Sequence, residues 1–338
     1  MPANRATPEG TERYRDRFAG RAAGDHFRQQ QGLVLSSIGI GTYLGNADEA
    51  TDRNYASAVV RAVQLGTNVI DSAANYRFQR SERSIGHALK QLATERGFAR
   101  EELVICTKGG YLPFDGSPPR NVREYFNETF VKPGIASFED VVAGSHCMTP
   151  AYLQSQVDQS LRNMELECVD VYYIHNPESQ LGHVSATEFY ARLKLAFERL
   201  EQNRKQGKLA HYGVATWNGF RVPAESRDHH SLVRMVELAR EAGGEDHGFR
   251  FIQLPFNLAM SEAITLANET LDGQHVTVVD AATRLGVTVV ASASLLQGRI
   301  EPRAAIQFVR SVPGITTALI GMSHVEHVEE NLGQDLQD

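Results

Sequence analysis

The 338-residue sequence predicts a single α/β domain of the (β/α)8 TIM barrel class, with an N-terminal arm and a long loop after the third strand. Eight short apolar runs alternate with segments of helical length, and eight strand–helix units are the number that closes such a barrel. Several of the runs are continuously hydrophobic, which is typical of strands buried on both faces. The predicted strands are residues 33–40, 67–71, 103–107, 169–175, 211–216, 251–254, 288–293 and 317–321.

The segments between these runs show the 3.6-residue spacing of amphipathic helices. The first ends before Gly66, a typical helix stop, and the third opens at Thr149 and Pro150, the expected N-cap and first helical residue. In chain order, the apolar faces lie within residues 56–63, 85–92, 153–164, 189–200, 231–242, 277–285, 304–311 and 324–333.

An open, doubly wound sheet is the alternative fold. Such a sheet normally has a Gly-rich phosphate-binding turn after its first strand. The nearest match is the segment GIGTYL at residues 39–44, in which Leu takes the place of the last glycine and no clear helix follows. The partial motif therefore favours the barrel.

The chain divides into an arm, residues 1–30, and a barrel domain, residues 31–338. The arm is polar and rich in Arg and Gly, so we expect it to be exposed, with one short helix after Thr7 and Pro8. A barrel of this kind takes about 250 residues, which leaves roughly 90 for the arm and the loops. The largest surplus, residues 109–149, carries many aromatic side chains and is expected to form part of a substrate-binding wall.

The composition disfavours several classes of partner. With 34 Lys and Arg against 41 Asp and Glu, the net charge of −7 argues against nucleic acid. No apolar run approaches the roughly 18 residues of a membrane-spanning helix, and the N-terminus lacks the apolar centre of a secretory signal. Cys106, Cys147 and Cys168 have no CxxC spacing and suit a reducing compartment. We therefore expect a cytoplasmic protein without a membrane partner, whereas the oligomeric state is not predicted.

Chemically active residues end several of the apolar runs, where the active sites of barrel enzymes lie. Tyr76 follows the second run by five positions and can fold over the same end. Any one such residue alone is more often structural, but the convergence of an acid, an amine, an imidazole and a phenol favours an active site. The residues that end the runs are Asp71, Lys108, His175, Thr216, Asn257 and Ser292.

These groups suit acid catalysis by a phenol. A free tyrosine has a pKa of about 10, and a nearby cation such as Lys108 is expected to lower that pKa. Asp71 would keep the lysine charged and in place, and His175 would hydrogen-bond the substrate oxygen or relay a proton. Reduction of a carbonyl by a nicotinamide cofactor requires an acid of this kind.

Ordered motifs across residues 27–332 resemble those of the aldo-keto reductase family. The resemblance implies a TIM barrel that binds an extended NADP(H) at its mouth without a Rossmann domain, and that reduces aldehydes or ketones. The matching segments are GIGTY at 39–43, DSAANY at 71–76, SERSIG at 81–86, CTK at 106–108, SLRNM at 160–164, DVYYIH at 170–175, QLPFN at 253–257 and EN at 330–331.

The resemblance also implies roles for individual residues. Tyr76 resembles the general acid, and Asp71, Lys108 and His175 complete the catalytic tetrad. The substrate is expected to contact Tyr43, His175 and Trp217. The cofactor is expected to contact Thr42, Asp71, Thr216, Gln253, Ser292, Leu295, Gly298, Gly321, Met322, Ser323, His327, Glu330 and Asn331. No metal site is implied, because His324 and His327 have ligand-like spacing but no third ligand.

Three features depart from the family pattern. Thr216 stands where the family usually has Asn or Arg, so anchoring of the carboxamide depends on a hydroxyl. Ser292 replaces the aromatic residue that commonly stacks on the nicotinamide, and the stacking partner is not predicted. The positions expected around the 2′-phosphate, Gly321 and His327, carry no Lys or Arg, so NADPH is expected and NADH stays possible.

The leading hypothesis is an oxidoreductase that reduces an aldehyde or ketone to an alcohol by hydride transfer from NADPH, with Tyr76 as the general acid. One alternative is an NAD-dependent aldose or alcohol dehydrogenase. Another is a cofactor-binding regulatory subunit resembling potassium-channel β subunits. The physiological substrate is not predicted.

Overall fold

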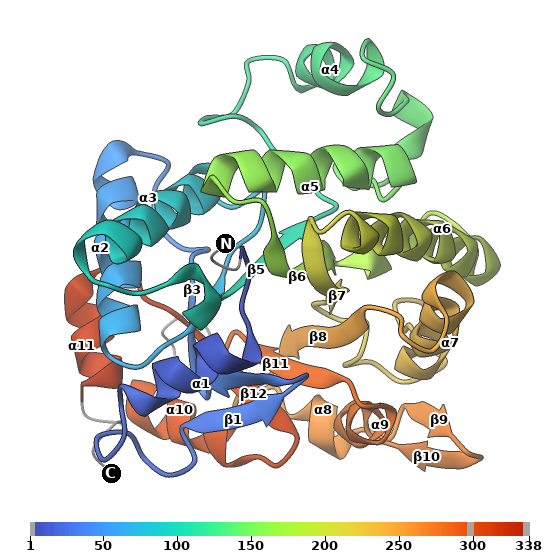
Figure 1. Cartoon of the computed structure of the whole chain (residues 1–338). Helices are drawn as coiled ribbons and strands as arrows, with labels where there is room; N and C mark the ends of the chain where they lie inside the picture. Colours follow the sequence, from blue (N-terminus) through green and yellow to red (C-terminus); the bar gives the residue numbers. More distant parts are fainter. Residues whose placement is uncertain (1–3, 296–300, 334–338) are drawn as a thin grey trace.

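The computed structural model describes residues 4–295 and 301–333 of the chain. Its centre is a closed barrel in which all neighbouring strands are parallel (Figure 1). The predicted (β/α)8 barrel is therefore confirmed. In chain order the barrel strands are β3 (Ile38–Gly41), β4 (Val69–Asp71), β5 (Val104–Gly109), β6 (Val169–His175), β7 (Leu209–Ala215), β8 (Phe249–Pro255), β11 (Thr288–Ser292) and β12 (Ile315–Gly321).

Helices surround the barrel and overlap the predicted amphipathic segments (Figure 1). They are α2 (Glu49–Gln64), α3 (Arg80–Glu95), α5 (Pro150–Met164), α6 (Ala186–Lys205), α7 (Leu232–Gly243), α9 (Val278–Leu285), α10 (Pro302–Ser311) and α11 (Val325–Leu332). Thr149 precedes α5 as expected, but its side chain makes no capping hydrogen bond. Within the described residues, no helix is both long and apolar enough to cross a lipid bilayer.

Shorter elements lie in the connections between the barrel strands and the outer helices. They are the 3-10 helices η1 (Arg100–Glu102) and η4 (Pro177–Gln180), the short helix α8 (Glu262–Thr265), and an antiparallel hairpin of β9 (Glu269–Leu271) and β10 (Gln274–Val276). The hairpin was not predicted, because its strands of three residues carry no long apolar run.

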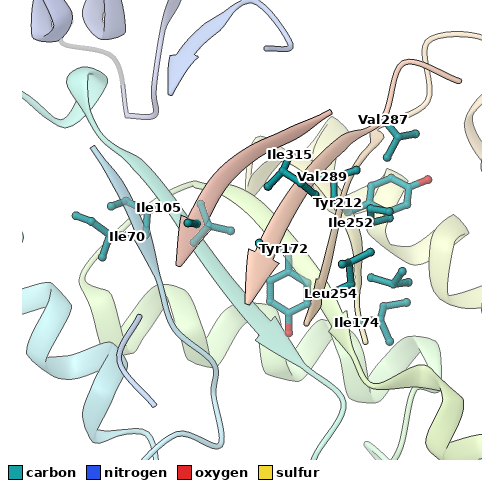
Figure 2. Close-up of a cluster of buried hydrophobic side chains, with 14 of the residues drawn as sticks. Ile70, Ile105, Tyr172, Ile174, Tyr212, Ile252, Leu254, Val287, Val289 and Ile315 are labelled. Carbon is teal, nitrogen blue, oxygen red and sulfur yellow. The ribbon is translucent and has the colours of Figure 1, made fainter. Parts of the chain in front are cut away.

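Alternate residues of each barrel strand face opposite sides, as the strand period of two requires. Val69, Val104 and Val171 belong to a small buried cluster inside the barrel. Their neighbours Ile70 and Ile105 belong to a larger cluster between the strands and the helices, part of which Figure 2 shows. Asp71, Lys108 and His175 lie an even number of residues beyond these inward-facing valines. Their side chains therefore face the inside of the barrel at its carboxyl end.

Residues 4–30 pack against the barrel through a few buried side chains, whereas many of the others are exposed, so the arm is exposed only in part. The helix predicted after Thr7 and Pro8 is present as α1 (Pro8–Asp16), and Thr7 caps it. Tyr14 is fully buried, and its hydroxyl donates to the backbone oxygen of Val63 (2.6 Å). A polar stretch can be buried in this way because its few apolar side chains are enough to anchor it.

The predicted first strand, residues 33–40, is two strands. β1 (Phe27–Gln30) pairs with β2 (Leu33–Ser36) in an antiparallel hairpin, whereas β3 joins the barrel after a break at Ser37. Leu33 and Leu35 of β2 pack in the inner cluster of the barrel. The hairpin therefore covers the amino end of the barrel and leaves the carboxyl end for a site.

The insertion after β5 forms a small subdomain over α5 (Figure 1). It contains α4 (Val122–Phe126), a π-helical turn at Asn127–Val131 and a 3-10 turn at Phe138–Asp140. Phe126 and Phe130 are buried against Tyr152 of α5, so these two rings are not available to form the expected substrate wall. The start and the end of the insertion, at Tyr111 and His146, lie beside His175 at the carboxyl end of β6.

Candidate active site

Three residues of the predicted tetrad lie on adjacent strands at the carboxyl end of the barrel. Asp71 ends β4, Lys108 lies near the end of β5, and His175 ends β6. The Lys108 ammonium is 1% exposed; it donates to the Asp71 carboxylate and to the backbone oxygen of Ser72 (2.7 Å). A buried ammonium held by a carboxylate and a carbonyl has a fixed position.

Tyr76 extends from the loop after β4 over this ion pair. The Lys108 Nζ atom lies 4.9 Å from the centre of the Tyr76 ring, within the range of a cation–π contact. The His175 ring lies edge-on to Tyr76, with 5.7 Å between ring centres. After Tyr76, three consecutive residues have positive φ, Arg77 (48°), Phe78 (58°) and Gln79 (70°), and lead the chain into α3. Residues other than glycine rarely adopt this backbone conformation. Contacts with the surrounding structure must therefore hold the loop that carries Tyr76.

The ion pair and the phenol shift each other's pKa. Burial alone lowers the pKa of Lys108, but Asp71 and Tyr76 outweigh it and raise that pKa above its ordinary value, so the ammonium stays charged. Burial raises the pKa of Tyr76, and Lys108 opposes this rise without overcoming it. Lys108 therefore acts on the pKa of Tyr76 in the expected direction, but the net pKa is raised because burial outweighs it. The loss of hydration destabilises the phenolate more than the charge of Lys108 stabilises it.

His175 is held as a neutral imidazole. Burial, and next the charge of Lys108, lower the pKa of His175 well below its usual range. Its Nδ1 atom is buried and has no hydrogen-bond partner in the part of the chain that the structure describes. The ring of Tyr111, at the start of the insertion, packs edge-on against it at 5.1 Å.

Two predicted cofactor residues instead contact Asp71 directly. The Gln253 amide of β8 donates to the free carboxylate oxygen of Asp71 (2.9 Å). The Thr42 hydroxyl, just after β3, donates to the backbone oxygen of Asp71 (3.1 Å). Both residues are buried, and they fix the orientation of the acid beneath Lys108. Nothing in the local sequence predicts these contacts, because 182 residues separate Gln253 from Asp71.

The predicted cofactor residues on the other strands also lie at the carboxyl end. Thr216 follows β7, Ser292 ends β11 and Leu295 lies three residues further on. The hydroxyls of Thr216 and of the neighbouring Ser294 are buried and have no hydrogen-bond partner among residues 4–295 and 301–333. Buried polar groups normally have partners, so these two hydroxyls mark a place where a polar ligand would be satisfied.

The candidates for the adenosine end lie at the end of β12 and along α11. Gly321 is exposed and pairs with Gly41 of β3, whereas the Met322 side chain is fully buried in the core and offers only its backbone. The Ser323 hydroxyl lies 2.9 Å from Nδ1 of His324. His327, Glu330 and Asn331 follow on α11, and Gly298 lies outside the described residues.

Two aromatic residues proposed to contact the substrate lie on loops at this end. Tyr43 is 58% exposed, and its ring lies 5.0 Å from that of Tyr76. Trp217 is 43% exposed, and Glu178 accepts a hydrogen bond from its backbone N–H (2.7 Å). Tyr43 is therefore beside the tetrad, whereas no contact joins Trp217 to it in the described residues.

No metal-binding constellation accompanies this arrangement. Among residues 4–295 and 301–333, no group of three or more His, Cys, Asp or Glu side chains is placed to hold a metal ion. The rings of His324 and His327 lie 5.3 Å apart on the surface.

Comparison with known proteins agrees with the geometry. A model of the Aldo/keto reductase family matches residues 37–234. The chain is 22% identical to the "Putative voltage-gated potassium channel subunit beta" of Schizosaccharomyces pombe, covering 90% of this chain and 86% of that protein. It is 26% identical to the NADH-specific methylglyoxal reductase of Escherichia coli, but the match covers only 54% of this chain and 49% of that protein.

A solved aldo-keto reductase from Klebsiella pneumoniae, in complex with NADPH, superposes with a TM-score of 0.57 at 18% identity. The superposition covers 90% of this chain and 86% of that chain, and at this identity it shows the shared fold. Because the family model spans more than half of the residues, the chain belongs to the aldo/keto reductase family.

Proposed function

We propose that the protein reduces an aldehyde or ketone to an alcohol with a nicotinamide cofactor, NADPH in the first instance, and that Tyr76 is the general acid. The observation that carries this proposal is the placement of the Tyr76 ring over the buried Lys108–Asp71 ion pair, with the ring of His175 edge-on to it. The same carboxyl end holds the buried hydroxyls of Thr216 and Ser294, which have no partner among the described residues and fit a polar ligand.

Each residue has a part in the proposed reduction. When bound, the cofactor supplies the hydride. Tyr76 donates its proton to the carbonyl oxygen as negative charge develops there. An alkoxide is far more basic than a phenolate, so this transfer is favourable even though the pKa of Tyr76 is raised. Lys108 stabilises the phenolate that remains, and the neutral ring of His175 orients the oxygen with its N–H.

The direct test is Tyr76→Phe, which removes the hydroxyl and keeps the ring. We expect kcat for reduction of a carbonyl panel that includes methylglyoxal to fall by about 10²- to 10⁴-fold. The dissociation constant of NADPH, measured by its fluorescence, should change little. Tyr43→Phe is the matched control, because Tyr43 lies in ring contact with Tyr76 and is not assigned a proton. Full turnover by Tyr76→Phe would remove the phenol from its assigned role.

Use of NADH, in reduction or in the oxidation of an aldose or another alcohol, is the second candidate. The observation that favours it is the absence of Lys and Arg from residues 321–333, where the 2′-phosphate of NADPH is expected. Since a neutral histidine is a poor substitute for a guanidinium, the selectivity for NADPH is expected to be modest. The ratio of the dissociation constants of NADPH and NADH tests this point.

A regulatory subunit with vestigial turnover is a further candidate, favoured by the match to the channel-subunit protein along most of both chains. The tetrad is compatible with either role. Single turnover without multiple turnover on any carbonyl of the panel would favour the regulatory role. The cytoplasmic location and the absence of a nucleic-acid partner stay predictions.

A further inference from the structure

A chain of hydrogen bonds leads from the surface to the backbone of His175. His146, which is fully buried at the end of the insertion, lies with its Nε2 atom 2.8 Å from the backbone oxygen of His175. Because a carbonyl oxygen can only accept, Nε2 carries the proton and Nδ1 does not. Nδ1 accepts from the amide of Gln180 (2.9 Å), whose oxygen accepts from Arg192 (2.9 Å). His146, Gln180 and Arg192 thus form a continuous series of hydrogen bonds, in which each donates to the next group toward His175.

The hydrogen bond from His146 takes the place of a backbone contact that β5 does not make with His175. β5 ends at Gly109, opposite Ile174, so no strand residue is in register beside His175 on this side. His146 fills that place with its ring instead. Burial lowers the pKa of His146 to about 4, so the ring stays neutral and keeps one donor and one acceptor.

Two neighbouring residues make room for this contact and enclose it. Gly110 has a φ of +140°, and a Cβ atom there would lie 2.9 Å from Nε2 of His146 and 3.1 Å from the backbone oxygen of His175. The Tyr111 ring lies edge-on between the two imidazoles, 5.3 Å from His146 and 5.1 Å from His175. The start and the end of the insertion therefore meet at His175.

We propose that His146 is a positioning residue for the reduction: it fixes the backbone and the ring of His175, and so the direction of the N–H that orients the substrate oxygen. This inference depends on the proposed role of His175. The insertion then serves catalysis by holding His175 and not mainly by forming a wall for the substrate. A small misplacement of a catalytic group lowers the rate strongly, so the effect should appear in kcat.

The test is a double-mutant cycle with His146→Phe and His175→Ala. In the wild-type background, His146→Phe should lower kcat by about 10- to 100-fold and leave the dissociation constant of NADPH unchanged. In the His175→Ala background, it should lower kcat no further, because its effect passes through His175. Equal fold-losses in both backgrounds, or no loss in the wild-type background, would overturn the proposal.

A pair of smaller changes keeps the proposal falsifiable if His146→Phe does not fold. The amide nitrogen of Gln can reach the place of Nε2, whereas that of Asn reaches only the place of Nδ1. His146→Gln should therefore retain much more kcat than His146→Asn. Equal kcat values for the two variants would count against the proposed hydrogen bond.

The chain contains a closely matched control, His26 at the amino end of the barrel. Its Nε2 atom lies 2.9 Å from the backbone oxygen of Gly66, and its Nδ1 atom lies 3.1 Å from the hydroxyl of Ser37, which accepts from Arg310. His26→Phe should lower the melting temperature about as much as His146→Phe but leave kcat unchanged. An equal loss of kcat in both variants would reduce the role of His146 to stability. If wild-type protein reduces no carbonyl, the proposed function fails first, and that result is distinct from an active wild type with an unaffected His146 variant.

Discussion

Two buried ion pairs lie at opposite ends of the barrel. At the amino end, Arg100 donates to Asp170 (2.7 Å), and at the carboxyl end Lys108 donates to Asp71. Both carboxylates are almost fully buried; Arg100 reaches Asp170 of β6 from η1, whereas Lys108 and Asp71 belong to the neighbouring strands β5 and β4. Each end of the barrel therefore has a buried carboxylate paired with a cation, and the Lys108 side chain (1% exposed) is more buried than that of Arg100 (15%).

The difference lies in what else contacts each pair. Asp170 also accepts from the backbone N–H groups of Ala6 and Ile105, each at 2.7 Å. These additional partners are backbone amides, which do not exchange a proton with a substrate. Lys108 instead lies under the ring of Tyr76, a group that can release a proton. A buried ion pair by itself does not identify an active site; the titratable neighbour does. Residues of like chemistry at the amino end are therefore matched controls for residues at the carboxyl end.

The largest expected effect is that of Lys108→Met. Removal of the ammonium should lower kcat on the order of 10²- to 10⁴-fold, because Tyr76 loses the charge that stabilises its phenolate. It should also lower the free energy of unfolding by about 3–5 kcal/mol, because the Asp71 carboxylate stays buried without its partner. Steady-state kinetics and urea denaturation measure the two effects.

The control for this variant is Arg100→Met. It breaks the other ion pair, so it should lower the free energy of unfolding to a similar extent while kcat of the folded protein stays close to that of the wild type. If Arg100→Met impairs kcat as strongly as Lys108→Met, the contrast between the two ends is wrong, and the activity merely follows stability.

A smaller effect is expected from Thr216→Val. The Thr216 hydroxyl is buried and has no partner within the described ranges, so replacing it by a methyl group should leave the free protein as stable or more stable. If the hydroxyl binds the cofactor, the dissociation constant of NADPH should rise by about 3- to 10-fold, the value of one hydrogen bond. Fluorescence titration measures the constant, and thermal denaturation measures the stability.

Thr67→Val is the control at the other end. The Thr67 hydroxyl is also buried and has no partner in the residues that the structure describes, but it precedes β4 at the amino end of the barrel. Its removal should leave cofactor binding unchanged. Equal dissociation constants for the two valine variants would show that Thr216 has no part in binding.

The tetrad could be predicted from sequence because its members are tied to local patterns. Asp71, Lys108 and His175 each follow or end a buried apolar run, and parallel strands bring such ends together at one rim. Tyr76 is five residues from Asp71, so the same loop carries it. The family motifs cover the same segments, and the barrel follows from the alternation of strands and helices.

The remaining contacts could not be predicted, because they join residues without a shared pattern. The contact of Gln253 with Asp71 depends on closure of the barrel, and that of His146 with His175 on the path of an irregular insertion. The N-terminal arm reads as polar, yet the ring of Tyr14 is enough to bury part of it. The net direction of the Tyr76 pKa depends on a balance of burial and charge that only the three-dimensional structure gives.

The smallest expected effect is that of pH, and its size distinguishes the phenol from the imidazoles. The pKa of His175 is lowered well below its usual range and that of His146 to about 4, so both rings stay neutral between about pH 5 and 8. Tyr76 must be protonated to act as the acid, and because its pKa is raised, it stays protonated throughout this range. We expect kcat/KM for reduction to be constant there and to fall only above about pH 10.

For alcohol oxidation the sign reverses, since the phenolate is then the base, and kcat/KM should rise toward the same pH. His26→Phe, at the amino end, should leave both profiles unchanged. A fall of the reduction profile with a midpoint of about pH 6 to 7 would instead show that an imidazole titrates in the reaction, and would transfer the acid role from Tyr76 to His175.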